Sequence, residues 1–261
     1  MPEVSIRAFA DNAAEPKVRG YLYIPETPNG NALILTHGAG SNAQAPLLVA
    51  LAETFSKSGF TILRCDLPYR QARSYGPPGP ADAARDRAGL KNAIAAIKKI
   101  LDGDYSRDQL ETSGAPPLSR SLRQGGDFDS RQRKLRIFLS GHSYGGRQCS
   151  VLCAELSKQE PDLVAALLLL SYPLHPPRKP EQQRTQHLPD LRTPTLFVSG
   201  TRDPFGSIEE LGRAIKMIPA KTKLVAIEGA GHDLGFQGKG KQEALTQQIF
   251  TDTVDFFALS S

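Results

Sequence analysis

The sequence has few cysteines. Three occur among 261 residues, at positions 65, 149 and 153, and three thiols cannot form the disulfide framework of a small secreted protein. Cys149 and Cys153 are four residues apart in a helical pattern, so both face the same way. We interpret them as small buried apolar residues, because a metal site would need further ligands near that helix and the sequence places none there.

Targeting segments and long apolar runs are also missing. The N-terminal stretch MPEVSIRAFADNAAEP lacks the basic-then-apolar form of a signal peptide. The longest apolar run, LVAALLLL at 163–170, is too short to span a bilayer. We therefore expect a cytoplasmic protein with no membrane partner.

Charge of one sign is not concentrated enough to indicate a nucleic-acid partner. The formal net charge is +5, from 32 basic and 27 acidic residues. Basic residues gather between positions 120 and 136, but aspartates are interleaved with them and Phe128 is the single aromatic residue there. Binding to nucleic acid would need a basic face with stacking partners, so we expect a solvated loop and no nucleic-acid binding.

Short apolar runs, in contrast, recur along the whole chain and alternate with helical patterns. Segments 4–9 and 18–25 suit an antiparallel hairpin. Unbroken apolar runs, which are typical of strands buried on both faces of a parallel sheet, occupy 31–37, 60–66, 135–141, 163–172, 194–200 and 223–229. Helical periodicity marks 45–59, 82–101 and 245–257.

This alternation predicts the fold class α/β, with helices on both faces of a mostly parallel sheet of about eight strands. We expect a single domain over residues 1–261. Two stretches interrupt the pattern, at about 103–134 and 171–191, and we expect both to be irregular loops. Neither is long enough to form a large lid domain.

One motif carries the chemistry. The sequence Gly141-His142-Ser143-Tyr144-Gly145 fits G-x-S-x-G and lies between a predicted strand and a predicted helix. A serine on such a tight strand-to-helix turn projects its hydroxyl away from the chain, and the flanking glycines permit close approach of strand and helix. Ser143 is therefore the candidate nucleophile.

A serine hydroxyl needs a base to take its proton, and His232 is the best candidate. It follows the last predicted strand and precedes the last helix, at the carboxyl end of a strand where functional groups of open sheets collect. The four other histidines lie within turn motifs or in the irregular segment: His37, His142, His175 and His187.

The histidine in turn needs an acid that holds its tautomer. Asp203 follows a predicted strand at its carboxyl end and is the first choice. Asp233 is adjacent to His232, which gives poor geometry for a bond to that ring, and Asp66 and Asp190 are weaker rivals.

The glycine-rich turn at 38–40 follows a predicted strand directly, so it can bring a backbone N–H to a developing negative charge. We predict an oxyanion hole made by the N–H of Tyr144 and that of Ala39 or Gly40. The residues expected to line the substrate-binding site are Tyr69, Tyr144, His175, Phe205 and Leu234.

Together these residues resemble the α/β-hydrolase superfamily over nearly the whole chain. The order Ser143, Asp203, His232 is the order of that family. The segments SYPLHPP, TPTLFVSGTRDPFG and DLPYR are similar to a small lidless branch near the dienelactone hydrolases. That branch includes bacterial proteins, a testis-expressed protein and a subunit of a histone acetyltransferase complex. The resemblance implies the three-layer α/β-hydrolase fold. Ser143 stands where dienelactone hydrolases proper are expected to have cysteine, so their substrate preference is not carried over.

These patterns predict a serine hydrolase that cleaves a carboxylic ester or thioester of a small soluble substrate, with no cofactor and no metal. Within enzymes, the same scaffold also serves peptidases, lactonases and cofactor-free haloperoxidases. The alternative of another class is a non-catalytic α/β-hydrolase-fold protein that uses the pocket for binding or as a scaffold. The oligomeric state and the acyl and leaving groups stay open.

Overall fold

Eight strands form one sheet. The computed structural model describes residues 3–102, 135–236 and 239–259. Across the sheet the strand order is β1-β2-β4-β3-β5-β6-β7-β8. The strands are β1 (Val4–Asp11), β2 (Val18–Pro25), β3 (Asn31–Thr36), β4 (Thr61–Cys65), β5 (Arg136–His142), β6 (Ala166–Leu170), β7 (Thr195–Gly200) and β8 (Thr222–Ile227).

Only β2 runs against the other seven strands. It pairs antiparallel with both β1 and β4, and the remaining pairs are parallel. The β1–β2 register runs from Val4 opposite Pro25 to Asp11 opposite Val18. The structure therefore confirms both the predicted mostly parallel sheet and the predicted hairpin.

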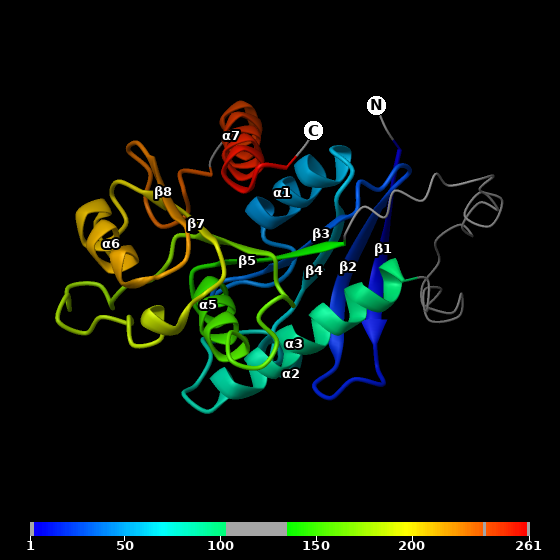
Figure 1. Ribbon diagram of the computed structural model, residues 1–261, viewed down its shortest axis with the longest axis horizontal. Helices are drawn as coiled ribbons and strands as arrows, with labels where there is room; N and C mark the ends of the chain where they lie inside the picture. Colours follow the sequence, from blue (N-terminus) through cyan, green and yellow to red (C-terminus); the bar gives the residue numbers. More distant parts are fainter. Residues whose placement is uncertain (1–2, 103–134, 237–238, 260–261) are drawn as a thin grey trace.

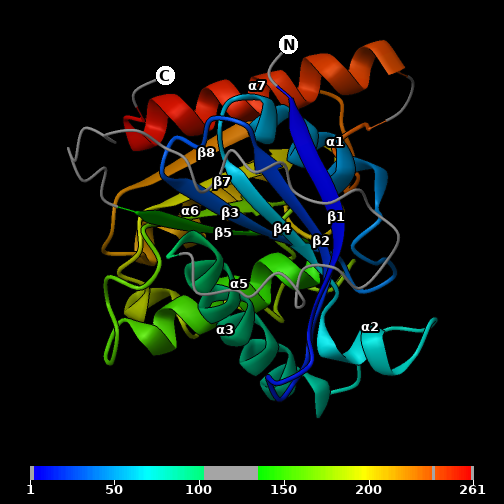
Figure 2. The same ribbon diagram turned by 90° about the vertical axis from the view of Figure 1, so that its right-hand side faces the viewer.

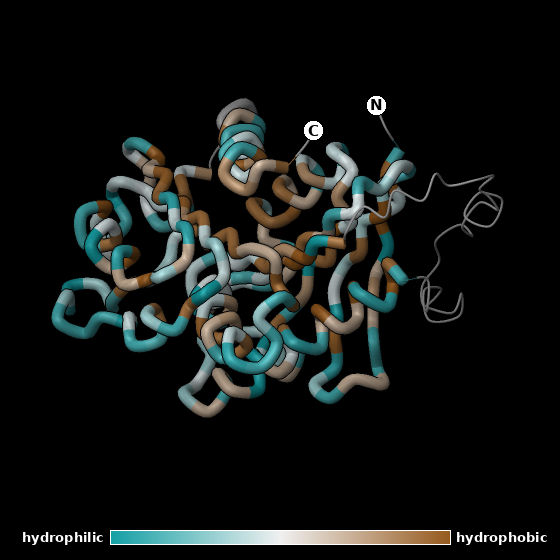
Figure 3. The backbone as a smooth tube through the Cα atoms, in the orientation of Figure 1, coloured by the Kyte–Doolittle hydropathy of each residue, from teal (hydrophilic) through white to brown (hydrophobic). Residues whose placement is uncertain are grey.

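Both faces of the sheet are buried, which explains the unbroken apolar runs. In β3 all six residues are buried. Ala32 and Ile34 belong to the core on one face of the sheet, whereas Leu33 and Leu35 belong to the core on the other, as the two-residue period of a strand requires. Figure 3 shows the hydrophobic colour concentrated on the central strands and the hydrophilic colour on the surrounding loops.

Helices form the outer two layers. One face of the sheet is covered by α1 and α7, and the other by α3 and α5 (Figures 1 and 2). The helices are α1 (Pro46–Lys57), α2 (Pro68–Ala72), α3 (Asp82–Leu101), α5 (Tyr144–Leu156), α6 (Ile208–Ala214) and α7 (Lys239–Phe257). The described residues also include two 3₁₀ turns, η2 (Leu188–Asp190) and η3 (Ile215–Met217). This is the three-layer α/β architecture expected from the sequence.

Two predicted features concern the segments between these elements. The stretch 171–191 contains η2 as its only helix or strand, as its proline-rich composition suggests, and 103–134 lies outside the described residues.

Cys149 and Cys153 are buried in the core beneath α5, and burial raises the pKa of Cys153 to about 12. Among the described residues, no helix is both long and apolar enough to cross a membrane.

The strand order places a topological switch point beside β3. This strand lies between β4 and β5. The chain crosses through α1 to reach β4 on one side of β3, and later through α3 to reach β5 on the other side. At such a switch point the connections leave the carboxyl ends of the two strands in opposite directions, which opens a ligand site between them. The segments that follow β3 and β5 there are Gly38–Gly40 and Ser143.

Candidate active site

Ser143 lies on a strained turn between β5 and α5. Its backbone has φ 51° and ψ −118°, a conformation that costs energy for any residue other than glycine. The turn is tight enough that a Cβ added at Gly141 would lie 2.5 Å from the Gly145 carbonyl carbon, and one at Gly145 would lie 2.5 Å from the His37 oxygen. Glycine at these two positions therefore lets β5, α5 and the end of β3 meet, with the serine at the tip.

A continuous chain of hydrogen bonds joins Ser143, His232 and Asp203. The Ser143 Oγ lies 2.8 Å from His232 Nε2. On the other side of the ring, His232 Nδ1 lies 2.8 Å from Asp203 Oδ2 and 3.0 Å from Oδ1. A carboxylate only accepts, so Nδ1 carries the proton and Nε2 is left to accept the hydrogen of the serine hydroxyl. This tautomer is the one in which the histidine can act as a base toward Ser143.

Asp203 is held where the carboxyl end of β7 meets the loop that carries His232. A Cβ added at Gly200, the last residue of β7, would lie 2.2 Å from the Ala230 oxygen, so strand and loop are in direct backbone contact. The side chain of Asp203 is 1% exposed and also accepts the N–H of Phe205 at 2.9 Å. The Phe205 ring lies over His232 with 4.2 Å between ring centroids. Water therefore reaches this hydrogen-bonded pair mainly from the side of the imidazole.

The segments that carry the predicted oxyanion donors both lie beside Ser143. Tyr144 is the first residue of α5, so its N–H has no partner within the helix. The loop after β3 also lies next to Ser143, because a Cβ added at Gly38 would lie 3.3 Å from the Ser143 Cβ.

Two side chains set the orientation of this loop. The Tyr69 hydroxyl lies 2.9 Å from the Ala39 oxygen and 3.2 Å from the Gly38 oxygen, and Arg70 donates to the Ala39 oxygen at 3.0 Å. In a planar trans peptide the carbonyl of one residue and the N–H of the next point in opposite directions. With both carbonyls turned toward Tyr69, the N–H groups of Ala39 and Gly40 face the other way.

The four residues expected to line the substrate site beyond Tyr144 occupy different surroundings. Phe205 is partly exposed beside His232. Tyr69 is 2% exposed and its hydroxyl bonds the Gly38–Gly40 loop instead. His175 is 5% exposed, with its ring between the Pro176 oxygen at 2.8 Å and Glu210. Leu234 is 1% exposed in the core under α1 and α7. Of the four, only Phe205 has side-chain surface available to a ligand next to the triad.

Three residues that the sequence pattern alone does not tie to the site also contact it. His142 donates from Nε2 to the His232 oxygen at 2.8 Å, and burial lowers its pKa, so the ring stays neutral. Arg70 holds the Ala39 carbonyl, as described above. Asp86 is fully buried on α3 and accepts the Tyr144 hydroxyl at 2.7 Å. The sequence pattern that could have indicated Asp86 is the helical period. Asp86 lies four residues before the apolar Leu90, and therefore on the buried face of the predicted helix.

The structure contains a second serine–histidine contact. Ser150 Oγ, in the second turn of α5, lies 2.8 Å from His187 Nε2. Ser150 is fully buried, so no substrate reaches it. Burial, with Arg147 and Arg87 nearby, lowers the pKa of His187 to about 4. Neighbouring cations disfavour the imidazolium that a general base must form, so we interpret this pair as part of the packing between α5 and η2.

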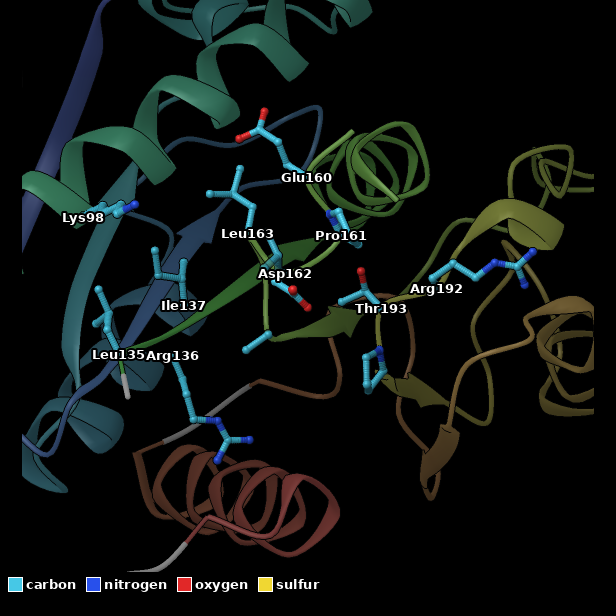
Figure 4. Close-up of a pocket in the computed structure, with 13 residues that line it drawn as sticks. Lys98, Leu135, Arg136, Ile137, Glu160, Pro161, Asp162, Leu163, Arg192 and Thr193 are labelled. Carbon is cyan, nitrogen blue, oxygen red and sulfur yellow. The ribbon is translucent and has the colours of Figure 1, made fainter. Parts of the chain in front are cut away.

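A hollow of about 740 Å³ lies at the amino-terminal ends of the parallel strands, opposite to the ends that carry Ser143 and Asp203. Its lining includes Arg136, Asp162 and Thr193, which lie at or just before the amino-terminal ends of β5, β6 and β7. Figure 4 shows it between the start of β5 and the Arg192–Thr193 segment. Ligands of open parallel sheets bind at the carboxyl ends of the strands, so this hollow is not the candidate active site.

The arrangement defines a class of protein: a three-layer α/β fold with a serine at a strand-to-helix elbow. Residues 116–258, more than half of the chain, match the family described as alpha/beta hydrolase domain. The chain therefore belongs to the alpha/beta hydrolase domain family. This membership supports hydrolase activity in general.

Solved structures of low sequence identity share the fold over almost the entire chain. A dienelactone hydrolase from Anabaena variabilis ATCC 29413 is 22% identical with a TM-score of 0.64, and the match covers 98% of this chain and 97% of that one. Est1E from Butyrivibrio proteoclasticus is 17% identical with a TM-score of 0.62, covering 97% and 99%. XC6422 from Xanthomonas campestris, an α/β serine hydrolase without lid, is 12% identical with a TM-score of 0.61, covering 99% and 97%.

The predicted resemblance to the α/β-hydrolase superfamily is thus confirmed, and its lidless, dienelactone hydrolase-like members are among the similar structures. Consistent with that branch, the described residues include no separate lid domain over the carboxyl ends of the strands.

Proposed function

We propose that this protein is a serine hydrolase that cleaves a carboxylic ester or thioester of a small soluble molecule through an acyl-enzyme. The observation that carries the proposal is the hydrogen-bond chain from Ser143 through His232 to Asp203. A protein that only binds a ligand has no need of a serine, a correctly oriented histidine and a buried acid in one line.

In the first half of the reaction, Ser143 Oγ attacks the acyl carbon while His232 Nε2 takes the hydroxyl proton. The carbonyl oxygen becomes an oxyanion, which the N–H of Tyr144 and that of Ala39 or Gly40 would stabilise. One such donor is worth about 10²–10³ in kcat. The intermediate collapses when the bond to the leaving oxygen or sulfur breaks, and His232 gives its proton to that atom. The acyl group stays on Ser143.

In the second half, water attacks the acyl carbon. His232 accepts a proton from the water and returns it to Ser143 Oγ as the carboxylic acid leaves. Asp203 stays ionised throughout and stabilises the imidazolium. The net reaction consumes one ester or thioester and one water and yields one acid and one alcohol or thiol.

The direct test is labelling with a fluorophosphonate probe, read by intact mass. An activated serine displaces fluoride and retains the phosphonyl group. We expect one label on the wild-type protein and none on Ser143→Ala. Ser150→Ala is the matched control, because it removes the serine of the other serine–histidine contact, and it should label like the wild type.

Hydrolysis of short esters and thioesters, compared with Ser143→Ala, then identifies the leaving group. Ser143→Ala should lower kcat by at least about 10³-fold. A folded wild-type protein that takes no label and hydrolyses none of these compounds would favour the binding or scaffold alternative instead.

A further inference from the structure

Asp86 is a buried carboxylate near the start of α3. It lies in the second turn of α3, with no exposed surface. Burying a carboxylate is costly unless its oxygens accept hydrogen bonds, so the partners of Asp86 show what its position serves. Burial raises its pKa, whereas the bonds it accepts lower it.

Each oxygen of Asp86 contacts a different residue that neighbours or carries a predicted oxyanion donor. Oδ1 accepts the backbone N–H of Tyr69 at 3.0 Å. Oδ2 accepts the Tyr144 hydroxyl at 2.7 Å, and burial together with Asp86 raises the pKa of Tyr144, so that hydroxyl keeps its hydrogen. The two tyrosine rings also meet edge to face, 5.8 Å apart at 88°.

Both tyrosines lead directly to oxyanion donors. Tyr144 supplies its own N–H, and its ring is tethered at the far end by Asp86. Tyr69 holds the carbonyls of Gly38 and Ala39, which orients the N–H groups of the loop. One carboxylate therefore connects, through Tyr69 and Tyr144, the two segments that carry the predicted donors.

The packing of α2 against α3 brings Asp86 close enough to bond the Tyr69 N–H. A Cβ added at Gly89, three residues after Asp86, would lie 2.4 Å from Pro68 Cγ. Only glycine allows the start of α2 to approach α3 so closely, and this approach brings the Tyr69 N–H within reach of Asp86.

We propose that Asp86 is a positioning residue that sets the two halves of the oxyanion hole at the correct separation. This inference rests on the proposed function, because it assigns Asp86 a role in that reaction. An oxyanion donor acts on charge that develops only in the transition state, so a change at Asp86 should alter kcat and leave KM nearly unchanged.

The test compares variants in hydrolysis of 4-nitrophenyl acetate, with kcat and KM determined separately. Asp86→Ala removes both acceptors, and Tyr144→Phe removes one hydroxyl without opening a cavity. We expect kcat to fall about 100-fold in the first and about 10-fold in the second, with KM within about twofold. Asp86→Asn keeps an oxygen for Tyr69 N–H and places an amide near the Tyr144 oxygen, so it should retain kcat within about fivefold.

Asp82→Ala is the matched control. Asp82 lies one turn earlier on α3 and bonds Arg73 and the Gly79 N–H, so this variant should keep the wild-type kcat. In the double variant Asp86→Ala/Tyr144→Phe, the two losses should not multiply, because both act through the same tether.

The outcomes separate the two proposals. A wild type that labels at Ser143 while folded Asp86→Ala keeps full kcat, or loses activity through KM alone, overturns the role of Asp86 and leaves the proposed function intact. A wild type without Ser143-dependent activity overturns both. If Asp86→Ala does not fold, Tyr144→Phe decides, and unchanged kcat in that variant rejects the proposal.

Discussion

Single atoms decide what the candidate site can do. His232 forms two ring contacts of nearly equal length, yet their roles differ because Asp203 only accepts and Ser143 can donate. His142 adds a third contact at the His232 backbone oxygen. The imidazole is thus held at its ring and at its main chain. Ser150 and His187 also pair a serine hydroxyl with a histidine ring. This pair cannot act as nucleophile and base, because burial blocks access of a substrate to Ser150 and nearby cations oppose protonation of His187.

At this scale we expect Asp203→Asn to lower kcat by about 10⁴-fold, as the equivalent change does in a measured triad. The amide nitrogen of asparagine can donate to Nδ1, which places the proton on Nε2 and prevents it from accepting the serine hydrogen. Steady-state kinetics at pH 8 measure the loss. Asp233→Asn is the control, because Asp233 bonds the Gly235 N–H and not the ring. A comparable loss in both variants would contradict the assignment of the acid.

At the scale of the element, close backbone contacts determine where the side chains lie. The elbow works because β5, α5 and the end of β3 touch at two glycines, and α2 touches α3 at a third. These contacts are between main chains or rings, which cannot move aside as a flexible side chain can. Helical propensity alone would favour alanine over glycine in α5, so the glycine at 145 reflects packing.

Gly145→Ala should therefore destabilise the protein by roughly 1–3 kcal/mol, the typical range for overpacking. It should also lower kcat, because relief of the clash moves Ser143. Gly212→Ala in α6 is the matched control, since nothing lies within 4 Å of its Cβ position. That variant should gain about 0.5–1 kcal/mol. Urea unfolding followed by circular dichroism measures both, and an equal effect of the two changes would reject the packing argument.

For the whole molecule, buried histidines connect stability to pH. Burial lowers the pKa of His37 and His142, and burial with two arginines lowers that of His187 to about 4 from an ordinary value of 6.5. Between about pH 4 and pH 6.5, His187 is protonated in the unfolded chain and largely neutral in the folded protein, so the unfolded chain binds more protons. The free energy of unfolding therefore decreases as pH falls through this window.

We expect stability to be lower at pH 5 than at pH 7, with up to about 1.4 kcal/mol per pH unit for each histidine inside its window. Urea unfolding at the two values measures the difference. His187→Gln retains a polar group for Ser150 but cannot titrate, so the decrease should be smaller in this variant. An equal decrease in wild type and His187→Gln would show that His187 does not contribute.

Much of this architecture follows from local sequence. Apolar runs predict buried strands because a parallel sheet covered on both faces offers no polar side, and β3 and β6 are buried throughout. The motif around Ser143 predicts its turn because few sequences tolerate that geometry. Asp203 and His232 are predictable as candidates because each directly follows a strand, and all strands of a parallel sheet end at one edge.

Other features depend on contacts between distant segments, which no local pattern encodes. Tyr69, His175 and Leu234 are expected at the substrate wall, yet all three are buried, and Tyr69 bonds Ala39, 30 residues away in the chain. The link from Asp86 to Tyr69 and Tyr144 joins positions 17 and 58 residues apart. The sequence by itself determined the fold, the elbow and the order of the candidate triad, because these depend on periodicity and steric limits of short segments. Only the tertiary structure decided which side chains hold the Gly38–Gly40 loop and which keep exposed surface beside Ser143 and His232, because these depend on how separate helices pack against one sheet.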